Sequence, residues 1–418
     1  REKPSIRKIR YVGYDSVSKD DIEEVVNVKP YTILNVELVK ANASKINGLY
    51  VEKGHYLAEV DYSVESVDDD GDVVDVVFTI LENPKVYVKQ IAFVGNQNLS
   101  DAELKSIMQT REGNELSFIT SSGAYNEDFF RTDLLRIQAY YHDFGYVTVK
   151  VDEPTATISV DRRFIYLSIP IAEGPQFDIG NISFSGIIEL KDKEGEVLVD
   201  DTKLEGLVSM ATGDRFSRTK LVENIQRITD AYRNEGYAYA NIIPNSIPNS
   251  DTRTVDLEFK VDPGELVSIG RIEVVGNTKT RDKVIRREMR VYEGELYREI
   301  GIKASQARIT QLGYFEKVEI KRSSGDAPNV MNLTVQVKEK STGTFQLGAG
   351  FSSVESFIAT AQISQQNFLG NGQSLSFSAQ LSFGDFGRKL ATLQFWDPYF
   401  MDTFWAFGIN AYLTQHFF

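Results

Sequence analysis

Apolar residues recur along this sequence at two spacings, one typical of helices and one typical of strands. Apolar stripes with a period of about 3.6 residues predict amphipathic helices. Three are clear and end in tyrosine, and a fourth is weaker: Val39, Ala43, Ile46 and Tyr50; Phe130, Leu134, Ile137 and Tyr141; Leu221, Ile225, Ile228 and Tyr232; Ile302, Ile309 and Leu312. Stretches in which apolar and polar residues alternate lie between the stripes and predict strands.

Two glycine signatures frame the stripes and indicate an internal repeat. An apolar strand that ends in glycine occurs four times, with spacings of 82, 91 and 90 residues, at Gly13, Gly95, Gly186 and Gly276. A second glycine follows each stripe, at Gly54, Gly145, Gly236 and Gly313. Glycine at such places suits turns and helix caps that need a positive φ. The sequence therefore predicts four copies of one module.

Each module also carries a shorter helix and a pair of strands. In the second module, Ser100 is a suitable N-cap for a helix over Asp101–Met108. Past the stripe, an alternating run of valines precedes a second alternating run at Phe164–Ile169, which predicts a hairpin. The valines are Val147, Val149 and Val151. The order of elements is β-α-α-β-β, an α+β module, with expected boundaries at 1–83, 84–174, 175–263 and 264–340, and a separate segment at 341–418.

The segment after residue 340 has a different composition. It holds six of the 106 charged residues but 17 of the 47 aromatic residues. Alternating runs such as Leu375–Phe383 predict about five strands of near ten residues, a length that lets tilted strands cross a bilayer. Half of a soluble sandwich would alternate too, but its wet face normally carries charge. The scarcity of charge favours a membrane.

Composition excludes several classes of function. A net charge of −14 argues against a nucleic-acid partner, and the absence of cysteine excludes thiolate sites. The three histidines lie far apart, and no catalytic set emerges, so we expect no enzyme activity and no cofactor. The chain starts at Arg1 without an apolar leader, which suggests a trimmed form, and it has no run of 18 apolar residues.

Several blocks resemble the Omp85 superfamily of outer-membrane proteins. They are Ile285–Arg290 with the following Glu293-Gly294, Thr342–Phe351, and Asn367–Gly372. The resemblance implies that the repeats are POTRA domains and that residues 341–418 are the first strands of an antiparallel transmembrane β-barrel, here truncated. Five strands cannot close a barrel, and family members commonly carry one more POTRA domain, so we expect further modules and strands outside this sequence.

The resemblance further implies an assembly and insertion factor for outer-membrane β-barrel proteins, located in the outer membrane with its repeats in the periplasm. Partners would be nascent β-barrel proteins, accessory lipoproteins and outer-membrane lipid, with periplasmic chaperones as further candidates. The alternatives are a polypeptide-secretion pore of the same superfamily and a soluble modular scaffold.

Three sets of residues are candidates for these roles. Edge-strand capture of clients is assigned to Val147, Val149 and Val151, although these valines could simply face the core. A lateral barrel seam is assigned to Phe345, Leu347, Gly348 and Gly350, whose glycines could instead make room inside the barrel. Lipoprotein docking is assigned to Arg287, Glu288 and Arg290, although Glu288, expected as an exposed helical charge, could simply be solvated.

Overall fold

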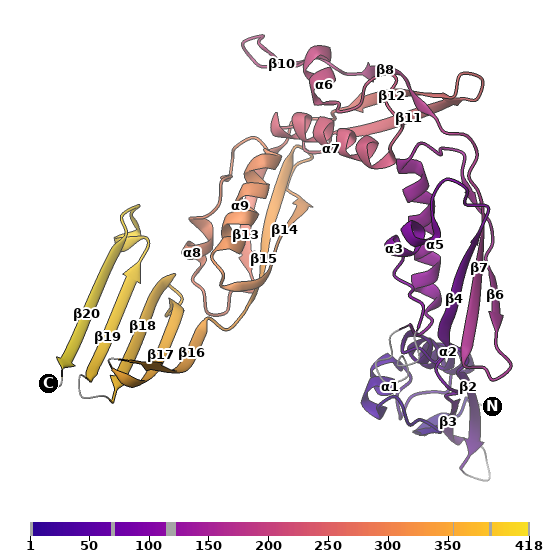
Figure 1. Cartoon of the computed structure of the whole chain (residues 1–418), viewed down its shortest axis with the longest axis horizontal. Coiled ribbons are helices and arrows are strands. Elements are labelled where there is room, and N and C mark those ends of the chain that lie inside the picture. The colour runs from indigo at the N-terminus through magenta and orange to yellow at the C-terminus, as the bar shows by residue number, and fades with distance from the viewer. Residues whose placement is uncertain (1–2, 68–71, 114–122, 354, 384–386, 417–418) are drawn as a thin grey trace. The chain divides into compact units, whose positions relative to one another are not determined.

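The computed structural model describes residues 3–67, 72–113, 123–353, 355–383 and 387–416 (Figure 1). The chain divides into two compact units. The first consists mainly of the two N-terminal modules, and the second mainly of the fourth module and a C-terminal sheet, while the third module contributes to both. No helix among the described residues is long and apolar enough to cross a membrane.

The first module has the predicted order of elements. These are β1 (Ser5–Val12), α1 (Lys19–Val25), α2 (Val36–Glu52), β2 (Glu59–Ser66) and β3 (Val73–Leu81). Its sheet has the order β1-β3-β2, in which β3 runs parallel to β1 and antiparallel to β2. The central strand is therefore the last one in sequence, and the strand after the long helix lies at an edge.

The other modules repeat this plan with local differences. The second has β4 (Tyr87–Val94), α3 (Asp101–Ile107), α5 (Glu127–Asp143), β5 (Lys150–Val151), β6 (Thr155–Ile158) and β7 (Phe164–Ala172). The third has β8 (Asp178–Gly186), β9 (Leu190–Lys191), β10 (Val197–Val199), α6 (Asp201–Leu207), α7 (Arg218–Asn234), β11 (Asn241–Asn249) and β12 (Thr254–Asp262). The fourth has β13 (Ser268–Val275), α8 (Asp282–Arg286), α9 (Glu299–Gln311), β14 (Phe315–Ser324) and β15 (Val330–Glu339). The small β9–β10 hairpin is an insertion that the sequence pattern did not predict.

The predicted apolar stripes form the cores. Tyr50, Tyr141 and Tyr232, which end the first three stripes, are all fully buried. In the first, second and fourth modules, the helices cover one face of the sheet, and the buried side chains of both layers meet there (Figure 1). Ser100 caps α3 and forms a capping box with Glu103, as its position predicted.

Two structural constraints favour glycine at the end of each module's first strand. Gly13, Gly95, Gly186 and Gly276 have φ between +86° and +96°, which favours a residue without Cβ. A Cβ on any of them would also lie 2.0–2.2 Å from a backbone carbonyl oxygen of the central strand. The chain therefore leaves the first strand pressed against its neighbour, and this contact fixes where the turn begins.

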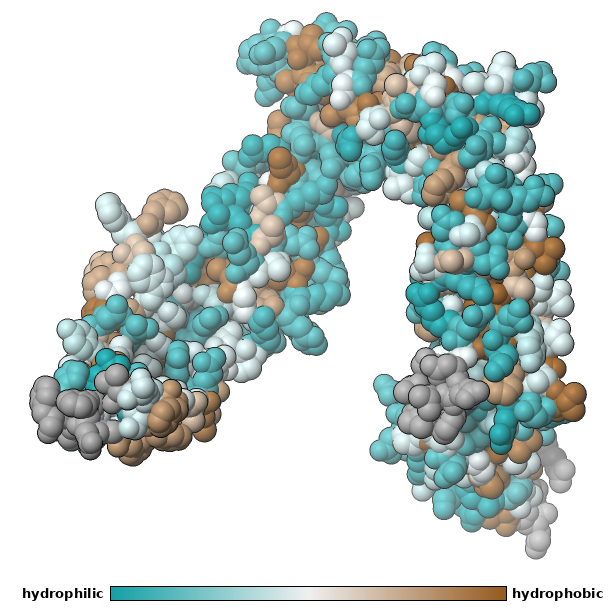
Figure 2. Space-filling model, in the orientation of Figure 1, coloured by the Kyte–Doolittle hydropathy of each residue, from teal (hydrophilic) through white to brown (hydrophobic). Residues whose placement is uncertain are grey.

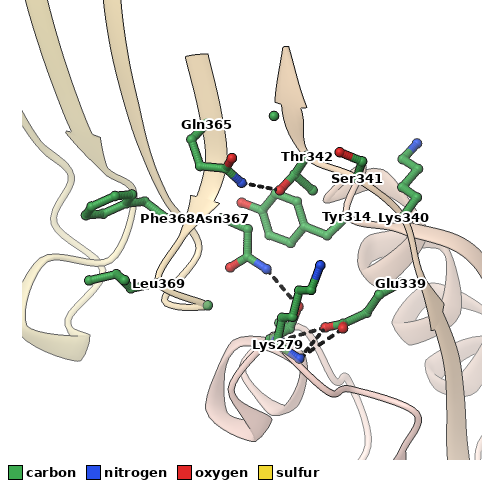
Figure 3. A pocket seen from close by; sticks show the side chains of 13 residues that line it. Lys279, Tyr314, Glu339, Lys340, Ser341, Thr342, Gln365, Asn367, Phe368 and Leu369 are labelled. Carbon is green, nitrogen blue, oxygen red and sulfur yellow. Dashed lines mark hydrogen bonds between the residues drawn. The ribbon is translucent and has the colours of Figure 1, made fainter. Parts of the chain in front are cut away.

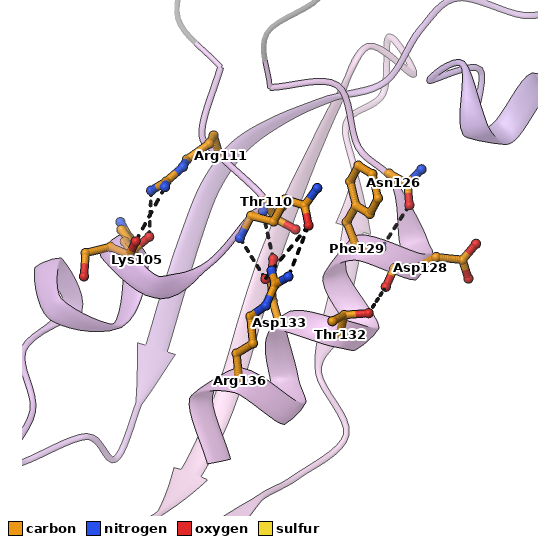
Figure 4. Close-up of polar contacts among 11 residues, drawn as sticks. Lys105, Thr110, Arg111, Asn126, Asp128, Phe129, Thr132, Asp133 and Arg136 are labelled. Atoms are coloured by element: carbon orange, nitrogen blue, oxygen red, sulfur yellow. Dashed lines mark hydrogen bonds and ion pairs between the residues drawn. The ribbon is translucent and has the colours of Figure 1, made fainter. Parts of the chain in front are cut away.

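A buried polar residue recurs on the long helix, at Asn42, Asp133, Asn224 and Ser305. Each accepts a hydrogen bond from a backbone N–H just after the short helix: Asn27, Gln109, Ser209 and Arg290. Asp133 also accepts from Thr110 N–H and pairs with Arg136, and Figure 4 shows these groups converging on its carboxylate. These bonds satisfy backbone donors of the chain segment that follows the short helix, where no helical or strand partner accepts from them.

The C-terminal sheet has five antiparallel strands in sequence order. They are β16 (Gly343–Ser352), β17 (Ser356–Phe368), β18 (Gln373–Ser382), β19 (Arg388–Asp397) and β20 (Phe407–His416), with the short 3₁₀ helix η1 (Phe400–Asp402) before the last. The register aligns apolar residues across strands in one row: Phe345, Ile363, Phe377 and Leu393. The next row is polar: Gln346, Gln362, Ser378 and Thr392.

Neighbouring rows point to opposite faces of a sheet, so one face is apolar and the other polar. The apolar side chains are exposed, with Phe345 at 67% and Leu347 at 73%. Brown, apolar side chains gather on the visible surface of this sheet in Figure 2. The structure confirms the predicted α+β modules followed by the first strands of a barrel-type sheet.

Candidate functional site

The first strand of each module has its outer edge covered by the chain segment between the two helices. In the fourth module, Ile269 donates to the carbonyl of Glu295 and accepts from Gly294 N–H, both at 2.8 Å. The carboxylate of Glu293 then accepts from Ile272 N–H at 2.8 Å. Equivalent backbone pairs join Ile6 to Tyr31 and Thr32, Val88 to Gly113 and Gly123, and Ile179 to Gly213 and Asp214. This edge cannot accept another strand there.

The opposite edge of each sheet is formed by the strand that follows the long helix. In β2, the N–H of Tyr62 donates to the side chain of Asp61 rather than to β3, which shows that it points away from the sheet. N–H groups alternate in direction along an antiparallel strand, so those of Val60 and Val64 point outward too. Outward N–H and C=O groups make this edge a template for another extended chain.

The predicted edge strand of the second module is misplaced. Val147 and Val149 lie in turns before the strand, where their N–H groups donate to Gly145 and Tyr146 carbonyls. Val149 is buried, and only Val151 belongs to a strand, β5, which pairs with β7. The chain must turn after the helix cap before it can join the sheet, so alternation in the sequence begins earlier than the strand.

The four proposed seam residues do lie together on one strand. Phe345, Leu347, Gly348 and Gly350 belong to β16, which forms one edge of the described five-stranded sheet. A Cβ on Gly348 would lie 2.6 Å from Thr360 Oγ1, whereas Gly350 has open space around it. Gly348 therefore makes room for a neighbouring side chain, and Gly350 is the glycine for which packing gives no reason.

The turn between β17 and β18 rests on the fourth module. Asn367 accepts from Gly372 N–H at 2.8 Å and donates to Thr280 Oγ1 at 2.7 Å. Arg281 N–H donates to the Gly370 carbonyl at 3.0 Å, and the Tyr314 hydroxyl donates to that of Gly372 at 3.2 Å. These contacts attach the sheet to the module through backbone groups as well as side chains.

A cavity of about 460 Å³ lies beside this turn (Figure 3). One of its walls is Glu339, which accepts from Thr278 Oγ1 and from the N–H groups of Lys279 and Thr280. Burial raises the pKa of Glu339, but these hydrogen bonds outweigh it and lower the pKa to about 2. The first module repeats this device: Glu82 accepts from Asp15 and Ser16 N–H and from the hydroxyls of Ser16 and Tyr50, and its pKa is also about 2.

Glu288 is buried rather than exposed, so the expectation of an exposed helical charge is wrong. It follows α8, is 4% exposed, pairs with Arg308 at 2.6 Å and accepts from the Tyr399 hydroxyl at 3.0 Å. The guanidinium of Arg287 lies 4.0 Å from the centre of the Tyr399 ring. An ion pair between Lys283 and Asp402, at 2.8 Å, also joins the fourth module to the C-terminal sheet. Of the three predicted docking residues, Arg290 is the exposed one.

The family model described as POTRA, surface antigen variable number repeat, matches residues 4–83, 86–174, 177–264 and 267–340. The chain belongs to the POTRA family. Its four POTRA domains together span most of the sequence. Crystallised POTRA domains 3–5 of BamA from Haemophilus influenzae share the fold, with a TM-score of 0.50 and 22% identity over 61% of this chain and 96% of that one.

Several curated relatives that match the chain are named outer membrane protein assembly factor BamA. The protein from Nitratidesulfovibrio vulgaris is 30% identical over 426 residues, which cover 100% of this chain and 51% of the relative. The protein from Neisseria meningitidis serogroup B is 30% identical over 340 residues, which cover 81% of this chain and 41% of the relative. The POTRA chain thus spans about half the length of the curated relatives it matches.

Proposed function

We propose that this chain belongs to an outer-membrane assembly factor that folds and inserts β-barrel proteins, with its POTRA domains in the periplasm. The relatives named as assembly factors support this role. The observation that carries it is structural: the outward N–H groups of β2, at the edge opposite the covered first strand, leave a defined place for an extended client. Backbone pairing at such an edge makes few demands on the sequence of the client.

The POTRA edges and the edge strand β16 have different roles: the first hold an extended client, and the second accepts its strands. Edges of POTRA domains, including β5 at Val151, hold client segments in an extended form. The edge strand β16 then offers ten residues, with apolar side chains on one face and polar ones on the other, to which a client strand can add. Each added strand satisfies backbone groups that lipid cannot satisfy, so pairing and insertion favour one another. Catalysis by a cofactor has no part in this mechanism.

The first prediction tests the proposed role directly. With a photo-reactive residue at Gln346 of β16, an unfolded outer-membrane β-barrel protein is expected to cross-link to the full chain in detergent micelles. A folded sample of the same client should not, because its strand edges are already paired. Equal cross-linking of folded and unfolded client would contradict templating by β16.

The proposed lipoprotein surface is the exposed side of the fourth POTRA domain around Arg290, held in shape by the buried Glu288. Arg290→Glu is expected to weaken co-purification of outer-membrane lipoproteins from a native membrane extract by direct loss of charge. Glu288→Gln should weaken it less, because Arg308 and Tyr399 keep a neutral hydrogen-bonding partner. Mass spectrometry of the purified complex measures both effects, and Arg290→Lys is the matched control. Full retention with Arg290→Glu would remove this assignment.

A further inference from the structure

Because the POTRA domains share one fold, the direction of a backbone N–H group in one edge strand predicts the direction at the matching position in another. β2 begins five residues after Gly54, and β11 begins five residues after Gly236. In β2 the N–H of Tyr62, eight residues after its glycine, points outward. Because both strands lie at the same edge of the same kind of sheet, the matching residue of β11 also has its nitrogen outward.

The matching residue of β11 is Pro244, and a second proline, Pro248, lies four residues further along. Both prolines therefore lie at positions whose backbone nitrogen points away from the sheet. This placement agrees with the strand itself, because a proline nitrogen facing β12 would remove a ladder hydrogen bond, yet β11 runs without interruption over Asn241–Asn249. At these two outward positions β11 therefore has no backbone N–H donor.

In the second POTRA domain a proline lies at a position whose backbone nitrogen points toward the neighbouring strand of the sheet. Pro154 lies nine residues after Gly145, which corresponds to an inward nitrogen. The inward direction is confirmed two residues earlier, where Asp152 N–H donates to the Pro170 carbonyl of β7 at 3.0 Å. The ladder stops there, and the pairing slips from Val151 opposite Ile171 to Thr155 opposite Ser168. This edge is cut into pieces of two and four residues.

We propose that the edge of the first POTRA domain, β2, is a principal client-pairing surface, and that Pro244 and Pro248 close the edge of the third. The proposal rests on the proposed function, since it concerns which edges hold an extended client. β2 has eight residues and contains no proline. Its exposed Glu59 and Asp61 favour an extended segment with basic residues between the apolar ones.

The test compares matched positions on the two edges. A photo-reactive residue is placed at Ser63 of β2 or at Asn245 of β11, each nine residues after its glycine, in the full chain. The probe is a synthetic ten-residue peptide that alternates valine and lysine. A lost hydrogen bond weakens binding by about fivefold, so we expect cross-linking at Asn245 to be roughly tenfold weaker or more.

Two sets of variants test whether the missing N–H donors, and not other differences between the two edges, cause the weaker cross-linking. Pro244→Thr combined with Pro248→Thr restores both donors and is expected to raise cross-linking at position 245 severalfold. Val64→Pro removes one outward donor from β2 without touching its pairing with β3, and should lower cross-linking at position 63 about fivefold, whereas Val64→Thr should not. Circular dichroism confirms that each variant is folded.

The outcomes distinguish this inference from the proposed function. Equal cross-linking at positions 63 and 245 in the unchanged chain would overturn the inference and leave edge capture standing. A double threonine variant that gains nothing would likewise overturn the role of the prolines. No cross-linking at either position, with or without the substitutions, would contradict capture of clients by these POTRA edges altogether.

Discussion

Replacement of Asp133 by leucine is expected to destabilise the second POTRA domain by about 3 kcal/mol or more. The Asp133 carboxylate is fully buried and accepts from the N–H groups of Gln109 and Thr110, both at 2.7 Å. Leucine would leave both donors buried without an acceptor, and each such donor costs about 1–3 kcal/mol. The protection of the Gln109 and Thr110 amides from hydrogen exchange measures the loss where it occurs.

The matched control comes from the neighbouring domains, which carry asparagine at this place. Asp133→Asn keeps one acceptor oxygen, as Asn42 and Asn224 do when they accept from Asn27 and Ser209. We therefore expect a loss of about 1 kcal/mol for asparagine. If leucine and asparagine reduced protection equally, the negative charge of Asp133, and not its second acceptor oxygen, would be the stabilising feature.

The hydrophobic pattern predicted the modules because their cores are built from local periodicity. Three of the four stripes end in a tyrosine that the structure buries, and each strand-ending glycine has the positive φ that its position suggested. The recurring buried polar residue was missed, since a polar side chain is usually read as exposed. A signal did exist: Asp133 lies on the apolar stripe between Phe130 and Ile137, twelve residues before Gly145, as Asn42 lies before Gly54.

The candidate sites were harder to predict because their contacts are remote in sequence. Glu288 is buried by Tyr399, 111 residues later, and no local pattern can show such a contact. The start of the edge strand in the second domain was also placed too early, since Val147 and Val149 continue the alternation of a strand while their N–H groups close turns. Alternation reports which side chains are buried, and a buried side chain can belong to a turn as well as to a strand.

Gly276→Ala is expected to destabilise the fourth POTRA domain by about 3 kcal/mol, from two separate causes. Gly276 has a φ of +87°, which costs a residue with a Cβ about 1–2 kcal/mol. The new Cβ would also lie 2.0 Å from the Val337 carbonyl oxygen, so β13 and β15 would have to move apart at a cost of about 1–3 kcal/mol. Hydrogen exchange of the β15 amides measures the combined effect.

Gly294→Ala in the same domain separates the two causes. Its φ of +88° is almost identical, but no atom lies within 4 Å of a Cβ built there. We therefore expect Gly294→Ala to destabilise the domain only by the cost of the positive φ, about 1–2 kcal/mol. An equal loss for both substitutions would mean that the close approach to Val337 relaxes without cost. A larger loss for Gly276→Ala would show that contact with the central strand fixes this turn, and with it Thr280, the residue of the same loop that holds Asn367 of the C-terminal sheet.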